Sequence, residues 1–162
     1  MIMTSTARET FSRITRSPEE TRRVGESIGR ELSGGEVLAL SGELGAGKTT
    51  LVQGIAKGLG VRTPYVASPT FILVSTHFGR VVLHHVDLYR LDGEAQAEEM
   101  GLLDYFSNDA VAVIEWADRA LSLLPAERLT VTLKMLSEEE REITLSAEGA
   151  HYVAMTRRIK TP

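Results

Sequence analysis

The chain has 162 residues, enough for a single domain with a substantial buried core. Its 18 Lys and Arg residues against 22 Asp and Glu residues give a net charge of −4, which argues against a protein that grips nucleic acid through bulk positive charge. The absence of cysteine excludes disulfides and thiolate metal sites, and no apolar run has the length of a membrane span or a signal peptide, so we expect a soluble cytoplasmic protein.

The first third of the chain predicts a helix, a strand and a second helix. Residues 1–16, which are polar near their start, are expected to form a loose arm. A helix is predicted over 17–32, because a serine can cap its first turn, a proline suits the next position, and apolar residues recur every four positions. The apolar run 36–41 (EVLALS) predicts a buried strand, and a helix is predicted over 47–59, ended by a glycine.

The rest of the chain predicts two hairpins, a short helix and one more buried strand. Residues 149–162 are expected to form a flexible tail. Buried strands separated by helices favour a three-layer α/β fold, with a mixed, mainly parallel sheet and antiparallel hairpin strands at its margin. We expect one domain over 1–162, built from strands over 70–77 and 80–87, a short helix between 94 and 106, a buried strand over 110–116, and alternating strands over 127–136 and 141–147.

A phosphate-binding motif lies between the first predicted strand and its helix. The run from Gly42 to Thr49 (GELGAGKT) matches G-x-x-x-x-G-K-[ST], and this strand–loop–helix context is the one that the motif requires. Its glycines would let backbone N–H groups curl around phosphate oxygens. Lys48 is expected to reach the β and γ phosphates of a nucleotide, and the Thr49 hydroxyl to bind Mg²⁺. The alternative is a glycine-rich turn with a solvated lysine; the motif in its context instead favours a P-loop NTPase fold and an ATPase.

Two carboxylates at predicted strand ends are candidates to complete such a site. Asp87 ends one apolar strand and Glu115 ends another. Ligands collect at the carboxyl ends of parallel strands, so both acids are expected near the γ-phosphate. One would hold the metal and the other would orient or deprotonate the attacking water, and the sequence leaves open which acid does which. Solvated strand ends are the alternative for both.

Several neighbouring residues are weaker candidates. One of His84 and His85, which alternate faces of a strand, should point inward as a packed or hydrogen-bonded core residue. Trp116 stands beside Glu115, with packing as the alternative to a functional role. The hydroxyls of Ser68 and Thr70 flank a proline.

Taken together, these motifs resemble one family. The runs that carry the resemblance are GELGAGKTT, SPTF, HVDLYR and IEW, in this order along the chain. They are similar to the bacterial tRNA threonylcarbamoyladenosine biosynthesis ATPase, the TsaE (formerly YjeE) family, over roughly residues 17–146. The resemblance implies ATP and Mg²⁺ as ligands, with ATP phosphates on the segment Gly45, Ala46, Gly47, Lys48, Thr49 and Thr50.

The resemblance also implies roles for single residues. Thr49 and Glu115 would serve Mg²⁺, and Asp87 would support hydrolysis. Ser68 to Phe71 would form a switch-like segment, with Ser68 and Thr70 in it. The nucleotide away from its phosphates would contact Thr21 and Arg141.

Partners follow from the resemblance too. Members of this family work with proteins of the TsaB and TsaD type, which resemble sugar-kinase-like ATPases, in making N6-threonylcarbamoyladenosine at tRNA position 37. The small ATPase would not form that bond; its slow, partner-dependent hydrolysis would reset the complex between turnovers. The tRNA would be reached only through these partners, in keeping with the net charge of −4, and no membrane is expected.

Two other function classes are open on sequence grounds. A small-metabolite or nucleoside kinase would also use a P-loop, but would need an arginine-rich lid, and Arg119 and Arg128 are isolated. A nucleotide-sensing binding module or guanine-nucleotide switch is the other. The N-K-x-D element that reads guanine is not found at Asn108-Asp109, so adenine is the expected base.

Overall fold

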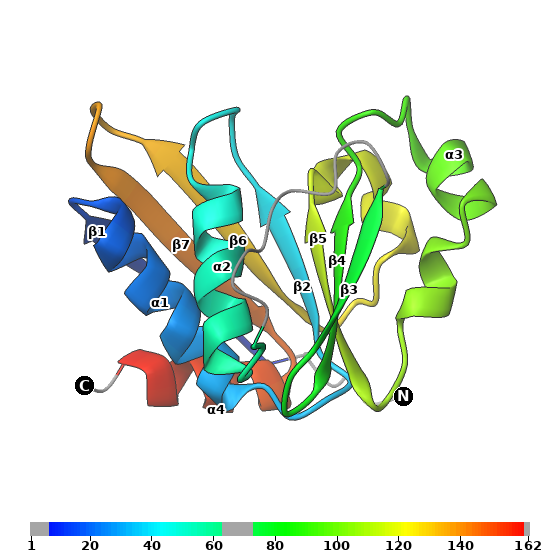
Figure 1. The fold of residues 1–162 in the computed structure, drawn as a ribbon, viewed down its shortest axis with the longest axis horizontal. Helices are drawn as coiled ribbons and strands as arrows, with labels where there is room; N and C mark the ends of the chain where they lie inside the picture. The colour runs from blue at the N-terminus through cyan, green and yellow to red at the C-terminus, as the bar shows by residue number, and fades with distance from the viewer. Residues whose placement is uncertain (1–6, 63–72, 161–162) are drawn as a thin grey trace, which may run out of the picture.

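One seven-stranded mixed sheet organises the chain, and the computed structural model describes residues 7–62 and 73–160 of it (Figure 1). The strand order is β1-β7-β6-β2-β5-β4-β3. The strands are β1 (Arg8–Thr15), β2 (Val37–Ser41), β3 (Val74–Phe78), β4 (Val82–Asp87), β5 (Ala110–Glu115), β6 (Arg128–Met135) and β7 (Arg141–Glu148). The helical elements are α1 (Pro18–Glu31), α2 (Lys48–Gly58), α3 (Glu94–Glu99), the 3₁₀ segments η1 (Leu102–Tyr105) and η2 (Ala117–Leu123), and α4 (Ala150–Lys160).

The centre of the sheet is parallel and its margins are antiparallel, as the sequence predicts. Strands β6, β2, β5 and β4 run parallel to one another. The pairs β3–β4, β6–β7 and β1–β7 are antiparallel. The β6–β7 hairpin lies further into the sheet than expected, because β6 pairs directly with central β2 and β1 forms the edge beyond β7. This arrangement brings the carboxyl ends of β2, β4 and β5 to one edge of the sheet.

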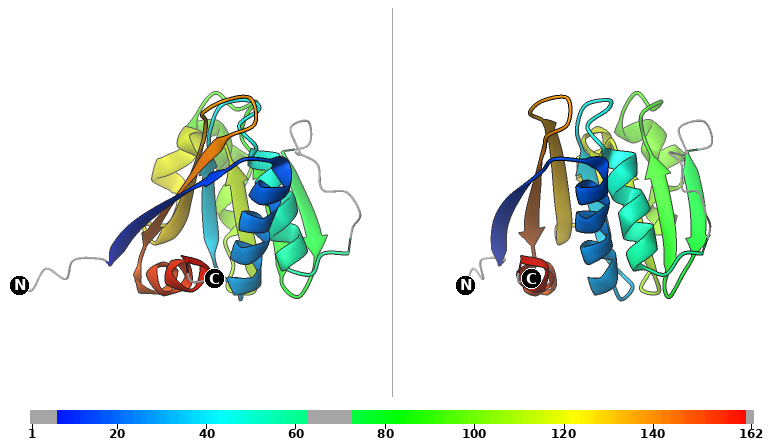
Figure 2. Two further views of the ribbon diagram at one scale, coloured as in Figure 1. Left: turned by 90° about the vertical axis from the view of Figure 1, so that its left-hand side faces the viewer. Right: turned by 60° about the vertical axis from the view of Figure 1, so that its left-hand side comes forward.

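Helical elements cover both faces, which gives the three layers. Helices α1 and α2 lie side by side on one face, and α3, η1 and η2 lie towards the other (Figures 1 and 2). Each face has its own buried apolar cluster, because side chains of one strand alternate between them. Leu38 and Leu40 of β2 face the α1/α2 cluster, whereas Val37 and Ala39 face the cluster under η2.

The predicted start of α1 is confirmed. Ser17 is the N-cap, and its side chain accepts a hydrogen bond of 3.1 Å from the amide of Glu20. Helices α1 and α2 approach so closely that a Cβ atom on Gly54 would lie 2.1 Å from the carbonyl oxygen of Arg22. Only glycine fits there. The helix that begins at the phosphate loop is therefore fixed firmly against its neighbour.

Two predictions for the ends of the chain are wrong. Within the expected loose arm, residues 8–15 form edge strand β1, which pairs along its whole length with β7. The expected flexible tail contains α4, which lies at the end of the sheet opposite the β2–α2 loop (Figure 2). The buried hydroxyl of Tyr152 accepts a hydrogen bond of 2.9 Å from the amide of Val37. The local sequence pattern of these two segments predicts no regular structure, because they are held by contacts with residues distant in the chain.

Other boundaries shift only slightly among the described residues. The predicted strand over 70–77 is observed as β3, Val74–Phe78, and residues 70–72 lie outside the described ranges. The short helix expected between 94 and 106 is split into α3 and η1, since Gly101 adopts a left-handed conformation between them. In the ranges that the structure describes, no helix combines the length and the apolar character needed to cross a membrane.

Candidate functional site

The predicted phosphate loop connects the end of β2 to the start of α2. A Cβ atom on Gly42 would lie 2.7 Å from the carbonyl oxygen of Leu133, so the loop can pass β6 only with glycine there. Gly47 is the N-cap of α2 in the left-handed conformation, with φ 101°. The first intrahelical bond runs from the Leu51 amide to the Gly47 carbonyl, so the amides of the first turn have no acceptor within the helix. This is the geometry of an anion site at a helix N-terminus.

Lys48 is the first residue of α2, and its buried side chain turns back towards the loop. Its ammonium donates to the carbonyl oxygens of Gly42 and Glu43 and lies 4.2 Å from the ring centroid of Trp116. Burial lowers the pKa of Lys48, and the negative charges of nearby carboxylates, Glu115 foremost, oppose that shift. The Lys48 side chain therefore places a positive charge inside the loop and links the start of α2 to the loop backbone at Gly42 and Glu43.

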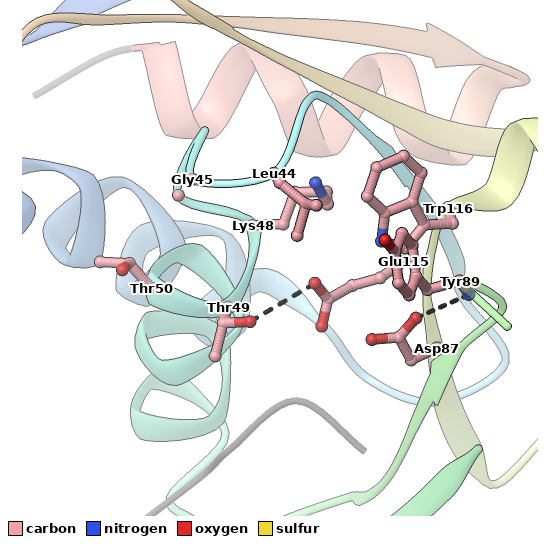
Figure 3. Close-up of a pocket in the computed structure, with 10 residues that line it drawn as sticks. Leu44, Gly45, Lys48, Thr49, Thr50, Asp87, Tyr89, Glu115 and Trp116 are labelled. Atoms are coloured by element: carbon pink, nitrogen blue, oxygen red, sulfur yellow. Dashed lines mark hydrogen bonds between the residues drawn. The ribbon is translucent and has the colours of Figure 1, made fainter. Parts of the chain in front are cut away.

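The two strand-end acids lie side by side at the carboxyl ends of their strands. Strands β4 and β5 are parallel, and their register pairs Asp87 with Glu115. Both side chains are buried. Glu115 Oε1 accepts a hydrogen bond of 3.4 Å from the Thr49 hydroxyl, and Asp87 Oδ1 accepts one of 2.8 Å from the amide of Tyr89 (Figure 3).

These oxygens form a donor set suited to Mg²⁺, which prefers hard oxygen ligands. The hydroxyl of Thr49 and the carboxylate of Glu115 are the pair that the family resemblance implies for the metal, whereas the residues alone left the choice between Asp87 and Glu115 open. In the part of the chain that the structure describes, no group of three or more His, Asp or Glu side chains could hold a metal ion by itself. A Mg²⁺ ion here would depend on phosphate oxygens and water for its other ligands, which is its usual mode of binding.

The predicted inward histidine is His85. Its ring is completely buried, and Nε2 lies 2.5 Å from Glu115 Oε2. His84 points to the other face, where Nδ1 lies 3.0 Å from the Thr76 hydroxyl. The expectation of a hydrogen-bonded core histidine is therefore confirmed, with a partner that the sequence did not name.

A cavity of about 330 Å³ opens over the loop (Figure 3). Trp116 forms part of its wall together with Tyr89, at a ring-centroid separation of 5.1 Å. Tyr89 and Leu44 line this cavity but were not among the predicted site residues; the position of Tyr89, two residues after Asp87, was the available signal. The lining consists of Leu44, Gly45, Gly47, Lys48, Thr49, Thr50, Asp87, Tyr89, Glu115 and Trp116.

A second cavity of about 310 Å³ shares Gly45, Gly47 and Thr50 with the first. Thr21 and Arg141, the two residues expected to contact the nucleotide away from its phosphates, both line it. The structure therefore joins the predicted phosphate residues and these two outlying residues around one loop. The remaining lining residues are Ser17, Pro18, Glu138 and Glu139.

Contacts within the protein already engage both outlying residues. The Thr21 hydroxyl lies 2.8 Å from that of Thr15, and both are buried. The Arg141 guanidinium donates to the Gly45 carbonyl oxygen at 3.2 Å and to carbonyls of the β6–β7 turn. Arg141 thus links that turn to the phosphate loop, which lies beside it in Figure 2.

One described residue of the predicted phosphate segment stays outside both cavities, and two predicted switch-like residues fall outside the described ranges. Ala46 is fully buried and lines neither cavity, and its amide donates to the Glu43 carbonyl at 3.0 Å. Ser68 and Thr70, with the rest of the expected switch-like segment, lie outside the described residues.

Comparison with known proteins gives one consistent result. The family model described as "Threonylcarbamoyl adenosine biosynthesis protein TsaE" matches residues 15–143. This chain belongs to the TsaE family. The matched TsaE region includes the predicted site residues from Thr21 to Arg141.

Relatives from several bacteria agree with the TsaE assignment. The tRNA threonylcarbamoyladenosine biosynthesis protein TsaE of Bacillus subtilis is 42% identical over 139 residues, 85% of this chain and 86% of that protein. The Treponema pallidum protein of the same name is 40% identical over 133 residues, 82% of this chain and 98% of that protein. The crystal structure of Bacillus subtilis YdiB superimposes with a TM-score of 0.83 at 34% identity, covering 96% of this chain and 97% of that one.

Proposed function

We propose that this chain binds and slowly hydrolyses Mg²⁺-ATP as the ATPase component of the machinery that makes N6-threonylcarbamoyladenosine at position 37 of tRNA. The observation that carries the ATPase is the meeting of four side chains at one cavity, namely Lys48, Thr49, Asp87 and Glu115. The TsaE names of its relatives support the role in tRNA modification. We further propose that it acts in the cytoplasm with partners of the TsaB and TsaD type, which would hold the tRNA.

Binding of the triphosphate would use the loop first. The amides at the start of α2 would donate to phosphate oxygens. The Lys48 ammonium, which donates to two loop carbonyls, would exchange these acceptors for the more strongly charged phosphate oxygens. The nucleoside end would lie towards the second cavity, where Thr21 and Arg141 would contact it.

The two acids would divide the remaining work. Glu115 is the one that contacts the Thr49 hydroxyl, so these two side chains would hold the metal. Mg²⁺, when bound, would neutralise the charge that develops on the phosphate oxygens. Asp87, paired with Glu115 in the sheet register but hydrogen-bonded to the Tyr89 amide, would orient the attacking water and accept its proton.

The contacts of Arg119, Arg128 and Asn108 argue against the kinase and the guanine-switch alternatives. Arg119 donates to the carbonyls of Tyr89 and Leu91, and Arg128 donates to that of Pro125, so both arginines serve the fold rather than a lid. The Asn108 carbonyl lies near Gly34, which precedes β2. Asn108 is therefore at the end of β2 opposite the phosphate loop, where it could not read the base of a nucleotide bound at that loop.

Reconstitution tests the proposal. The protein is added to the tRNA-modifying partners with ATP, threonine, bicarbonate and tRNA, and modified adenosine is measured over several turnovers. We expect the wild-type chain to permit repeated turnover, the Lys48→Ala variant to permit little, and Lys57→Ala, an exposed lysine on the same helix, to behave as wild type. Modification that stops after one turnover with the wild-type chain would refute the proposed role, and phosphate transfer to an added nucleoside would favour a kinase.

A further inference from the structure

His85 is a buried polar residue that contacts the site without entering it. It lies on β4 two residues before Asp87, is fully buried, and lines neither cavity. An ionised carboxylate can only accept hydrogen bonds, so in the 2.5 Å contact with Glu115 Oε2 it is Nε2 of His85 that donates. Within the described ranges, the other ring nitrogen has no hydrogen-bond partner. The polar character of this ring is therefore directed at one atom, Oε2 of Glu115.

Glu115 is consequently held at both of its oxygens by two different elements. Oε1 accepts from the Thr49 hydroxyl of α2, and Oε2 accepts from His85 of β4. The last torsion of a glutamate side chain is soft, so a single long contact of 3.4 Å would leave the plane of the carboxylate poorly fixed. Magnesium demands near-ideal octahedral geometry from its ligands, so its affinity depends on how the plane of the Glu115 carboxylate is oriented.

We propose that His85 is a positioning residue that fixes the Glu115 carboxylate for Mg²⁺, and that the gain in nucleotide affinity from Mg²⁺ depends on it. The inference deepens the proposed function and rests on it, since it assumes that Thr49 and Glu115 hold the metal. An apolar ring would fill the same space, so the hydrogen bond to Glu115 is what a histidine adds at this position. Removing the partner that orients a metal ligand typically costs about 10- to 100-fold in metal affinity or activity.

The test measures binding rather than turnover. The affinity for a non-hydrolysable ATP analogue is measured by calorimetry with saturating Mg²⁺ and again with EDTA, and the ratio of the two dissociation constants is the Mg²⁺ enhancement. In His85→Phe, which keeps a ring but loses the donor, this enhancement should fall about 10- to 100-fold while the affinity in EDTA stays within about twofold. His84→Phe, the neighbouring histidine on the opposite face, is the matched control and should keep the wild-type enhancement.

Conservative variants separate positioning from packing. The amide nitrogen of His85→Gln can take the place of Nε2, so this variant should recover most of the enhancement, whereas the shorter His85→Asn should not. If His85→Phe fails to fold, the comparison of the Mg²⁺ enhancement in His85→Gln and His85→Asn still tests whether His85 positions Glu115. Full enhancement in His85→Phe or His85→Asn would overturn the proposal, as would equal losses in Gln and Asn. A wild-type protein with no Mg²⁺ enhancement would overturn the proposed metal site itself, and this inference with it.

Discussion

The contact between α1 and α2 makes a prediction that runs against intrinsic helix preference. Replacing Gly54 by Ala should by propensity stabilise α2 by about 1 kcal/mol. A Cβ at this position would lie 2.1 Å from the Arg22 carbonyl oxygen, and real Cβ atoms essentially never come within 3.0 Å of such an atom. The obstacle is backbone, so the two helices must separate by about 1 Å along this direction, which also disturbs their other close glycine contacts at Gly25, Gly29 and Gly58.

The magnitude follows from overpacking. Extra methyl groups forced into packed interiors cost about 1–3 kcal/mol, and an immovable backbone oxygen places Gly54→Ala towards the upper end, at about 2–3 kcal/mol net. For a chain of this size each kcal/mol lowers the melting temperature by about 2–4 °C, so a decrease of roughly 4–12 °C is expected.

Thermal and urea unfolding followed by circular dichroism measure this loss. Gly93→Ala is the control, because a Cβ there meets nothing within 4 Å and the backbone is extended. It should change stability by no more than about 0.5 kcal/mol. A Gly54→Ala variant as stable as the wild type, or more stable, would refute the reasoning from the close helix approach.

Three further predictions concern the site, acid stability and the C-terminal helix. Lys48→Ala should reduce ATP hydrolysis on the order of a hundredfold, since a preorganised charge contact is lost, and a steady-state phosphate-release assay that shows wild-type turnover would contradict this. Burial alone would raise the pKa of Glu36, but hydrogen bonds from His151, Ser33 and Gly34 outweigh it and hold that pKa below its usual 4.5. The pKa of Glu36 is lower in the folded than in the unfolded protein, so ionised Glu36 stabilises the fold fully above about pH 4.5, and this stabilisation is lost as the pH falls through the folded-state pKa. The urea midpoint of Glu36→Gln should therefore change less between neutral and acidic pH than that of the wild type, and an equal change in both would contradict this. Tyr152→Phe should destabilise the fold by about 1–3 kcal/mol, because the buried Val37 amide loses its acceptor; an unchanged urea midpoint would argue that α4 is not anchored there.

The sequence by itself determined the phosphate loop and the centre of the fold. The loop motif is local, since its glycines, lysine and threonine lie within eight consecutive positions between a strand and a helix. Asp87 and Glu115 could be expected at the same edge of the sheet because parallel strands place their carboxyl ends there. That they are direct neighbours in the register came from the structure. The alternation of His84 and His85 likewise follows from the period of a strand.

Only the tertiary structure decided which segments are ordered at the chain ends and which side chains meet. Strand β1 has a mostly exposed, polar sequence, and its order comes from pairing with β7 more than 120 positions away. No local pattern gives the contact of His85 with Glu115, the approach of Arg141 to Gly45, or the glycine contact of α1 with α2, because each joins residues distant in the chain. Local propensity fixes elements within a few residues of themselves, whereas the partners of a buried polar group are set by the packing of whole elements.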